Sequence, residues 1–190
     1  MTRRLDIHAA KKLRGRARHE SAFFAAMDAL DGWTPTQTER PFEVAKLPVY
    51  EKAASARHGT PSFRRAVVQR LLAQAARLAT RTPSRVAAII DWPGLFMAEL
   101  CVFHDHTYAI GFDPATRARQ PRPARTHWDG GWVEARDPAT DLLADLHLTL
   151  PAGFTAHGID IAEYDHDTTI LNERSEWVVM TTQPSERSLP

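Results

Sequence analysis

The segment from residue 85 to residue 112 places the strongest constraint on the fold. It contains three apolar runs of strand length, rich in Val, Ile, Phe and Tyr, which turn-forming residues separate at Pro93-Gly94 and at Asp105-His106. Short β-branched and aromatic runs divided by turn residues are typical of antiparallel strands joined by hairpins. We therefore predict a three-stranded antiparallel meander at the centre of the core, with strands at 85–92, 95–104 and 107–112.

Two helices are predicted ahead of this meander. The apolar positions between Phe23 and Leu30 are spaced by three and four residues, which places them on one helical face. The second helix has Thr60 as its N-cap and Pro61 at its first position, and its apolar stripe continues until the breaker at Pro83. We expect most of the arginines along this second helix to form a solvated face.

The remaining chain is predicted to supply further strands and one long connection. A short strand at 42–50 contains Pro48, which favours a sheet edge. Residues 113–136 are rich in proline and arginine and are interpreted as a loop, and long loops of this kind are often functional. The later predicted strands lie at 143–151, 158–165 and 175–182.

Early helices followed by antiparallel strands define an α+β fold, with the two main N-terminal helices packed on a mostly antiparallel sheet. A length of 190 residues is typical of one domain, here 1–190. The basic segment 1–20 and the polar tail 183–190 could be mobile. No apolar run approaches the roughly 20 residues of a membrane span, and no apolar stretch follows the basic N-terminus. We therefore expect a cytoplasmic protein without membrane contact.

Five short stretches resemble one protein family in their order along the chain. They are KKLRG at 11–15, KLPV at 46–49, TP at 60–61, IIDWPGLFMAELCVF at 89–103 and LTLPAGF at 148–154. Their order resembles that of an uncharacterised bacterial family catalogued as domain of unknown function 3916. The resemblance implies the same α+β architecture and carries no catalytic motif.

Charge is divided unevenly along the chain. Residues 1–136 carry 22 Lys and Arg against 13 Asp and Glu, whereas residues 137–190 carry two Arg against ten acids. Such asymmetry indicates either that the two parts pack on each other or that one of them meets a charged partner.

The favoured hypothesis is a binding module whose late acidic turns lie free at the outside and meet a basic protein partner. Immunity proteins that block the nucleic-acid-binding cleft of a toxin work in this way, and opposite charge speeds their encounter. The comparison is an analogy between classes of protein. The predicted partner-binding residues are Asp160, Glu163, Asp165, Asp167, Glu173 and Glu176.

A metal-dependent hydrolase is the first alternative. Alternate residues of a strand point to one side, so His104 and His106 could present two imidazoles to one metal ion. A third ligand would have to come from His127, His147, His157 or the turn at 165–167. The competing interpretation is a polar hairpin turn, and we favour no metal and expect no cofactor.

Nucleic-acid binding is the second alternative, through the N-terminal basic segment and the arginines of the loop, Arg117, Arg119, Arg122 and Arg125. The chain lacks the G-x-S-x-G motif of serine hydrolases, and it also lacks phosphate-loop and dinucleotide fingerprints. Its single cysteine, Cys101, excludes an intrachain disulfide and is expected to be a core side chain.

Overall fold

The computed structural model describes residues 12–36, 39–47, 59–93, 95, 98–119, 126–128 and 130–182. Within these residues the chain forms a seven-stranded sheet in the order β1-β3-β2-β7-β6-β5-β4, and all neighbouring strands are antiparallel. The strands are β1 Phe42–Lys46, β2 Arg85–Trp92, β3 Ala98–Phe103, β4 Thr126–Trp128, β5 Gly131–Arg136, β6 Phe154–Tyr164 and β7 Ile170–Thr181. The predicted α+β fold with N-terminal helices on an antiparallel sheet is confirmed.

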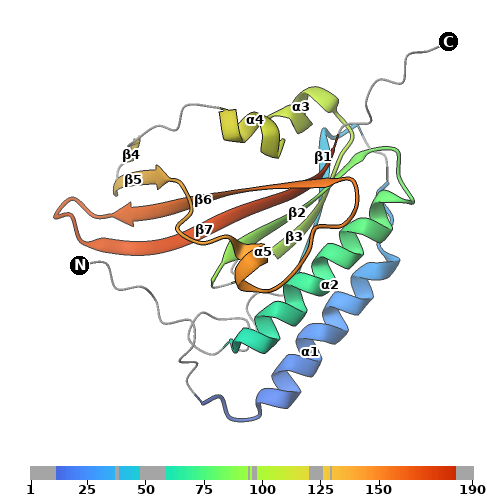
Figure 1. Cartoon of the computed structure of the whole chain (residues 1–190), viewed down its shortest axis with the longest axis horizontal. Helices are drawn as coiled ribbons and strands as arrows, with labels where there is room; N and C mark the ends of the chain where they lie inside the picture. The colour runs from blue at the N-terminus through green and yellow to red at the C-terminus, as the bar shows by residue number, and fades with distance from the viewer. Residues whose placement is uncertain are drawn as a thin grey trace.

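Helices cover both faces of the sheet (Figure 1). The long helices α1 and α2 lie on one face with the short α5, while α3 and α4 lie on the other. Their bounds are α1 Arg16–Ala29, α2 Pro61–Ala79, α3 His106–Ile110, α4 Pro114–Arg119 and α5 Leu142–Asp145, and a 3-10 turn, η1 Leu30–Gly32, follows α1.

The predicted start of α2 is confirmed in detail. The Thr60 hydroxyl accepts a hydrogen bond from the Phe63 backbone N–H at 3.2 Å, and Pro61 occupies the first helical turn. Such a side-chain acceptor satisfies one of the backbone donors that a helix start leaves unpaired. The helix then buries Val67 and Leu71 against Phe23 of α1 and Ile90 of β2 in the larger core cluster.

A second, smaller cluster lies on the opposite face. It contains Ala87, Ile89 and Cys101 of the central strands together with Ala109 of α3, and Phe112 packs against it. All eight residues of β2 and all six of β3 are buried, because apolar layers cover these strands from both sides. The sequence therefore shows continuous apolar runs here, as is usual for strands buried on both faces.

The third predicted strand, at 107–112, is wrong, because this segment forms α3. The Asp105 carboxylate accepts hydrogen bonds from the backbone N–H groups of Thr107 at 2.7 Å and Tyr108 at 3.2 Å. This cap starts a helical turn at the point where a hairpin was expected. The Tyr108 ring stacks on Phe42, with ring centroids 5.1 Å apart, so the aromatic side chains still pack on the sheet.

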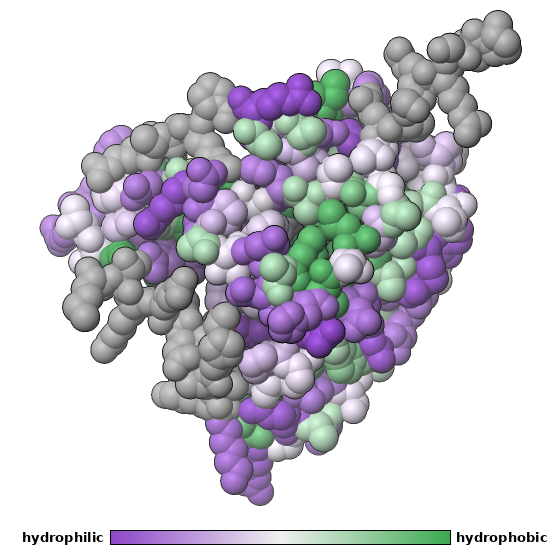
Figure 2. Space-filling model, in the orientation of Figure 1, coloured by the Kyte–Doolittle hydropathy of each residue, from purple (hydrophilic) through white to green (hydrophobic). Residues whose placement is uncertain are grey.

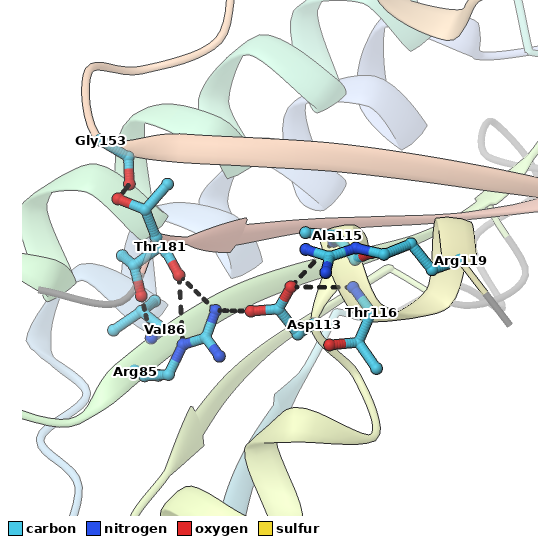
Figure 3. A network of polar contacts seen from close by, with 9 residues as sticks. Arg85, Val86, Asp113, Ala115, Thr116, Arg119, Gly153 and Thr181 are labelled. Atoms are coloured by element: carbon cyan, nitrogen blue, oxygen red, sulfur yellow. Dashed lines mark hydrogen bonds and ion pairs between the residues drawn. The ribbon is translucent and has the colours of Figure 1, made fainter. Parts of the chain in front are cut away.

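The predicted loop at 113–136 also contains regular structure, namely α4, β4 and β5. Asp113 accepts hydrogen bonds from Ala115 and Thr116 at the start of α4, and it also pairs with the Arg85 guanidinium at 2.5 Å. Figure 3 shows Arg85 joining this carboxylate to the Thr181 backbone oxygen at the end of β7. A buried ion pair therefore holds α4 on the sheet.

The predicted strand at 143–151 is likewise wrong. Asp141 caps α5 by accepting hydrogen bonds from Leu143 and Ala144, and no strand is present between 143 and 151 in the described chain. Leu146 is buried and Leu148 packs against the larger core cluster. The alternating leucines thus anchor an irregular segment on the core, which produces the same apolar pattern as a half-buried strand.

Most of the α2 arginines form the expected solvated face, and Arg64 is the exception. Arg64 is 1% exposed and lies 5.7 Å from the centroid of the Trp92 ring, and burial lowers its pKa to about 10. Arg70 and Arg77 are exposed but pair with Asp28 and Asp31 at 2.7 Å, which joins α2 to α1 and η1. Because α2 packs on both α1 and the sheet, the part of its surface that is buried extends beyond its apolar residues and includes Arg64 and Gln74.

The remaining predictions on element positions agree with the structure where it describes them. The strand β1 forms one edge of the sheet, as Pro48 suggested, although residues 48–50 lie outside the described chain. The predicted strands at 158–165 and 175–182 correspond to β6 and β7, which are longer than expected. The basic residues 1–11 and the tail 183–190 also lie outside the described residues.

Candidate functional site

The strands β6 and β7 form a long hairpin that extends beyond the part of the sheet covered by α1 and α2 (Figure 1). Its turn is ordered by the Asp165 carboxylate, which accepts hydrogen bonds from the backbone N–H groups of Asp167 at 3.0 Å and Thr169 at 2.8 Å. Residues 166–171 are all exposed. Two large apolar side chains are among them, Ile170 at 44% and Leu171 at 59% exposure. The turn therefore presents carboxylates beside an apolar pair.

Strand β5 supports the outer side of this hairpin. The Trp132 ring stacks on the Tyr164 ring with centroids 3.8 Å apart. Gly131 has φ +147, and a Cβ atom at this position would collide with the Tyr164 backbone oxygen. A glycine is therefore required where β5 begins to pair with β6. The sequence signal for this contact is the Gly130-Gly131 pair between two tryptophans.

Three of the six predicted partner-binding carboxylates pair with the protein's own arginines. The Glu163 carboxylate contacts Arg174 at 2.6 Å, Glu176 contacts Arg117 of α4 at 3.2 Å, and Glu173 contacts Arg136 of β5 at 3.7 Å. The expectation that all these groups lie free was wrong. Strand pairing and the covering helix α4 bring arginines from other parts of the chain beside them, which sequence position alone does not reveal.

The other three predicted carboxylates have no lysine or arginine partner in the described chain. Asp160 accepts hydrogen bonds from the Ser175 hydroxyl at 2.5 Å and from the Ala139 backbone N–H at 2.7 Å, so it ties the segment before α5 to the sheet. Asp165 organises the turn, and Asp167 is exposed at its tip. Residues 154–181 together carry six carboxylates and one arginine. Negative charge therefore remains in excess along the hairpin.

Asp91 is a functional candidate that the sequence analysis missed. It lies directly opposite Glu176 in the pairing of β2 with β7, and it is 5% exposed. One of its carboxylate oxygens is 3.1 Å from Arg174 Nε, but this contact is poorly aligned as a hydrogen bond. Burial raises its pKa to about 6; Arg174 opposes this shift, and the nearby Glu176 and Glu163 add to it. The only sequence signal is an acidic residue within an otherwise apolar run.

The two metal candidates belong to different surroundings. His104 Nε2 is 2.7 Å from a Glu43 oxygen, and His104 Nδ1 is 3.2 Å from the Ser84 hydroxyl. His106 instead begins α3 and is exposed. Among the residues that the structure describes, no group of three or more His, Cys, Asp or Glu side chains is placed to hold a metal ion. The hydrolase hypothesis therefore has no ligand set in this part of the chain.

The loop arginines proposed for nucleic-acid binding are engaged where they are described. Arg117 pairs with Glu176, and Arg119 Nε donates to the Ala115 backbone oxygen at 3.1 Å. Arg122 and Arg125 lie outside the described residues, as do residues 1–11 of the N-terminal basic segment.

A cavity of about 480 Å³ borders the base of the hairpin. Its walls include Leu143, Leu150 and Asp141 from the segment around α5, together with Gly158 of β6 and Trp177 of β7. Figure 2 shows apolar residues gathered near α2 and the segment leading into β6, while hydrophilic residues dominate the hairpin end of the same view. The surface beside the hairpin is thus mainly polar.

These features define an α+β protein with a charged, projecting hairpin, in which no described helix combines the length and apolar character that crossing a bilayer requires. The family model described as a protein of unknown function, DUF3916, matches residues 25–181, and the chain belongs to this family. The predicted family resemblance is thereby confirmed. Searches of curated proteins and of solved structures found no match.

Proposed function

We propose that the protein is a cytoplasmic binding module whose β6–β7 hairpin recognises a basic protein partner. The observation that carries this proposal is the charge of the hairpin, which extends beyond the helical layer. Residues 154–181 carry six carboxylates and one arginine, and carboxylates stay in excess when Arg117 and Arg136, which pair with Glu176 and Glu173, are counted as well. An excess of one sign of charge on a projecting element attracts and orients a partner of opposite charge.

The turn offers a contact surface as well as charge. Asp167, Ile170 and Leu171 are exposed within five residues of each other, and the Asp165 carboxylate accepts hydrogen bonds from the backbone N–H groups of Asp167 and Thr169 in the same turn. Burial of apolar surface is the main favourable term in most protein association, whereas charges mainly set the rate of encounter and the specificity. A preformed turn also reduces the entropy lost on binding.

The internal ion pairs narrow the recognition surface to the turn. Glu163, Glu173 and Glu176 already share arginines of the same chain, so a partner gains less from them. Asp165 and Asp167 have no cationic partner in the described residues and remain available to lysine or arginine side chains. We therefore place the centre of the interface at residues 165–171.

The test is affinity capture from a lysate of the source cell, with captured proteins quantified by mass spectrometry. Wild type is compared with Asp167→Lys, with Leu171→Ser and with Asp145→Lys, a matched charge reversal on exposed α5. We expect a basic protein to be retained by wild type and Asp145→Lys, lost with both turn variants, and released as salt is raised. Retention by all four proteins, or enrichment of no basic protein, would contradict the proposal.

An immunity role makes a narrower prediction. If the retained protein degrades nucleic acid, adding the wild-type chain should inhibit that activity. The two turn variants should inhibit it at least about 10-fold less strongly, which corresponds to about 1.4 kcal/mol of lost binding free energy. Undiminished nuclease activity in the wild-type complex would assign the hairpin to binding without inhibition.

A further inference from the structure

We infer that Ser84, His104 and Glu43 form a nucleophilic serine site that can accept an acyl group. The Ser84 hydroxyl is 3.2 Å from His104 Nδ1, and His104 Nε2 is 2.7 Å from a Glu43 oxygen. A hydroxyl, an imidazole and a carboxylate in hydrogen-bonded series activate serine in hydrolases. Here the two ring nitrogens exchange the roles they have in serine proteases, since Nδ1 faces the hydroxyl and Nε2 faces the carboxylate. The site is separate from the hairpin and does not depend on the proposed binding function.

The hydrogen bonds determine which ring nitrogen of His104 carries the proton. The pKa of Glu43 is lowered below its ordinary value, because the hydrogen bonds from His104 and Thr36 outweigh the opposing effect of burial. The ionised carboxylate can only accept, so His104 Nε2 carries the proton and donates it. In the neutral imidazole Nδ1 then holds a lone pair, which can accept a hydrogen bond from the Ser84 hydroxyl. This is the tautomer that a general base requires.

Neighbouring groups hold Glu43 in place. One of its oxygens accepts from the Thr36 backbone N–H at 2.9 Å, and the other accepts from the Thr36 hydroxyl at 3.0 Å. Strand pairing places Phe42, which precedes Glu43, opposite Phe103, which precedes His104. Glu43 and His104 therefore lie at the same end of the paired strands β1 and β3. Glu43 is therefore a positioning residue that acts through the imidazole.

The site can be reached from solvent. Ser84 lies directly before β2 and is half-buried, while the side chains of His104 and Glu43 are each 14% exposed. The hydroxyl is thus neither enclosed in the core nor fully solvated. The substrate class that suits such a site is a carboxylic ester that approaches from the surface.

The reaction proceeds in two balanced steps. Ser84 Oγ bonds to the ester carbonyl carbon while its proton passes to His104 Nδ1, and the alcohol leaves with that proton. Water then attacks the acyl carbon and gives a proton to Nδ1. The bond from Ser84 Oγ to the acyl carbon breaks, the hydroxyl recovers its proton from Nδ1, and a carboxylic acid is released.

Ser175 provides an internal control. Its hydroxyl also forms a hydrogen bond with a carboxylate, that of Asp160 at 2.5 Å, but no imidazole takes part in that contact. The two serines thus separate the effect of the imidazole from the effect of an ordered hydroxyl.

The experiment is labelling of the full chain with a fluorophosphonate probe, with sites and rates determined by peptide mass spectrometry. We expect Ser84 to react at least about 100-fold faster than Ser175, within the range that a general base contributes. His104→Ala should remove that advantage. Equal reaction of Ser84 and Ser175, or undiminished reaction of Ser84 in folded His104→Ala, would overturn the inference.

Two further variants make the test independent of folding defects. Glu43→Gln should slow the labelling of Ser84 and change its pH profile, an effect that a purely structural role would not produce. Ser84→Cys should react rapidly with iodoacetamide at neutral pH because the imidazole assists loss of the thiol proton, whereas burial raises the pKa of Cys101 to about 12. A Ser84→Cys thiol no more reactive than that of a free peptide would also overturn the inference.

Discussion

Among single residues, Asp91 has the chemistry that depends most on its surroundings. A carboxylate near the end of a fully buried strand loses its hydration, and the single contact with Arg174 does not restore it completely. Its pKa of about 6 lies well above the ordinary aspartate value of 3.8. The folded state therefore binds a proton at Asp91 more tightly than the unfolded state does.

This difference predicts a specific pH dependence of stability. The favourable contribution of protonated Asp91 is complete below pH 4 and is lost as pH rises through about 6, a change of about 3 kcal/mol. The amide introduced by Asp91→Asn cannot titrate, so this variant does not lose stability in the way that wild type does as pH rises. Its free energy of unfolding, measured relative to that of wild type, should therefore increase by up to about 3 kcal/mol between pH 4 and pH 7. Urea denaturation at each pH measures it.

The control for this prediction is Ile90→Val, a neighbouring core change without an ionisable group. Its stability difference from wild type should stay constant over the same pH range. If the difference for Asp91→Asn also stayed constant, Asp91 would have to titrate alike in the folded and unfolded states.

Single residues also show why the serine network was missed. The absence of G-x-S-x-G excludes one local backbone arrangement around a serine, but it does not exclude a serine that contacts a histidine from elsewhere in the chain. Ser84 and Glu43 lie 20 and 61 positions from His104, so no short motif could reveal the three together. His104 was a candidate from its sequence pattern, although as a metal ligand. The correct partners could be known only once β1, β2 and β3 were paired.

At the scale of elements, capping side chains decide where the helices begin. Asp105 and Asp141 start α3 and α5 as Thr60 starts α2, each by accepting backbone N–H groups. The long α2 was predictable because 19 residues repeat an apolar period behind its cap. The short helices α3 and α5 have too few residues to show a helical period, so the apolar pattern of their sequences was interpreted as that of strands.

The cap of α2 leads to a second stability prediction. Thr60→Ala removes the acceptor for the Phe63 N–H and should lower the free energy of unfolding by about 1 kcal/mol. Urea denaturation measures the loss. Thr60→Ser keeps the hydroxyl and should remain within about 0.5 kcal/mol of wild type; an equal loss in both variants would show that the Thr60 methyl group, and not the cap, is responsible.

For the whole molecule, the two-sided sheet connects every layer. Helices α1 and α2 pack on one face of β2 and β3, α3 packs on the other, and β7 continues from β2 into the hairpin. Loss of the central strands would expose both core clusters together. The single domain over 1–190 stays a prediction, and it has its own test.

We expect unfolding in urea to be one cooperative transition. Trp92 and Trp177 lie in the larger core cluster and Trp132 lies beside the hairpin, so tryptophan fluorescence samples both regions. Its midpoint should coincide with that of far-UV circular dichroism. Two fluorescence transitions with different midpoints, of which Trp132→Phe removes the one at lower urea concentration, would show that the hairpin end unfolds independently.

The sequence by itself determined the features that local chemistry encodes: two strands too apolar to lie at a surface, a capped long helix, an edge strand marked by proline, and an acidic C-terminal region. Tertiary structure decided which charges are free and which polar groups meet. Arg117, Arg136 and Arg174 reach Glu176, Glu173 and Glu163 only through strand pairing and the docking of α4. The physical reason is that apolar periodicity is a property of neighbouring residues, whereas an ion pair or a hydrogen-bonded triad depends on distances that exist only after the sheet has formed.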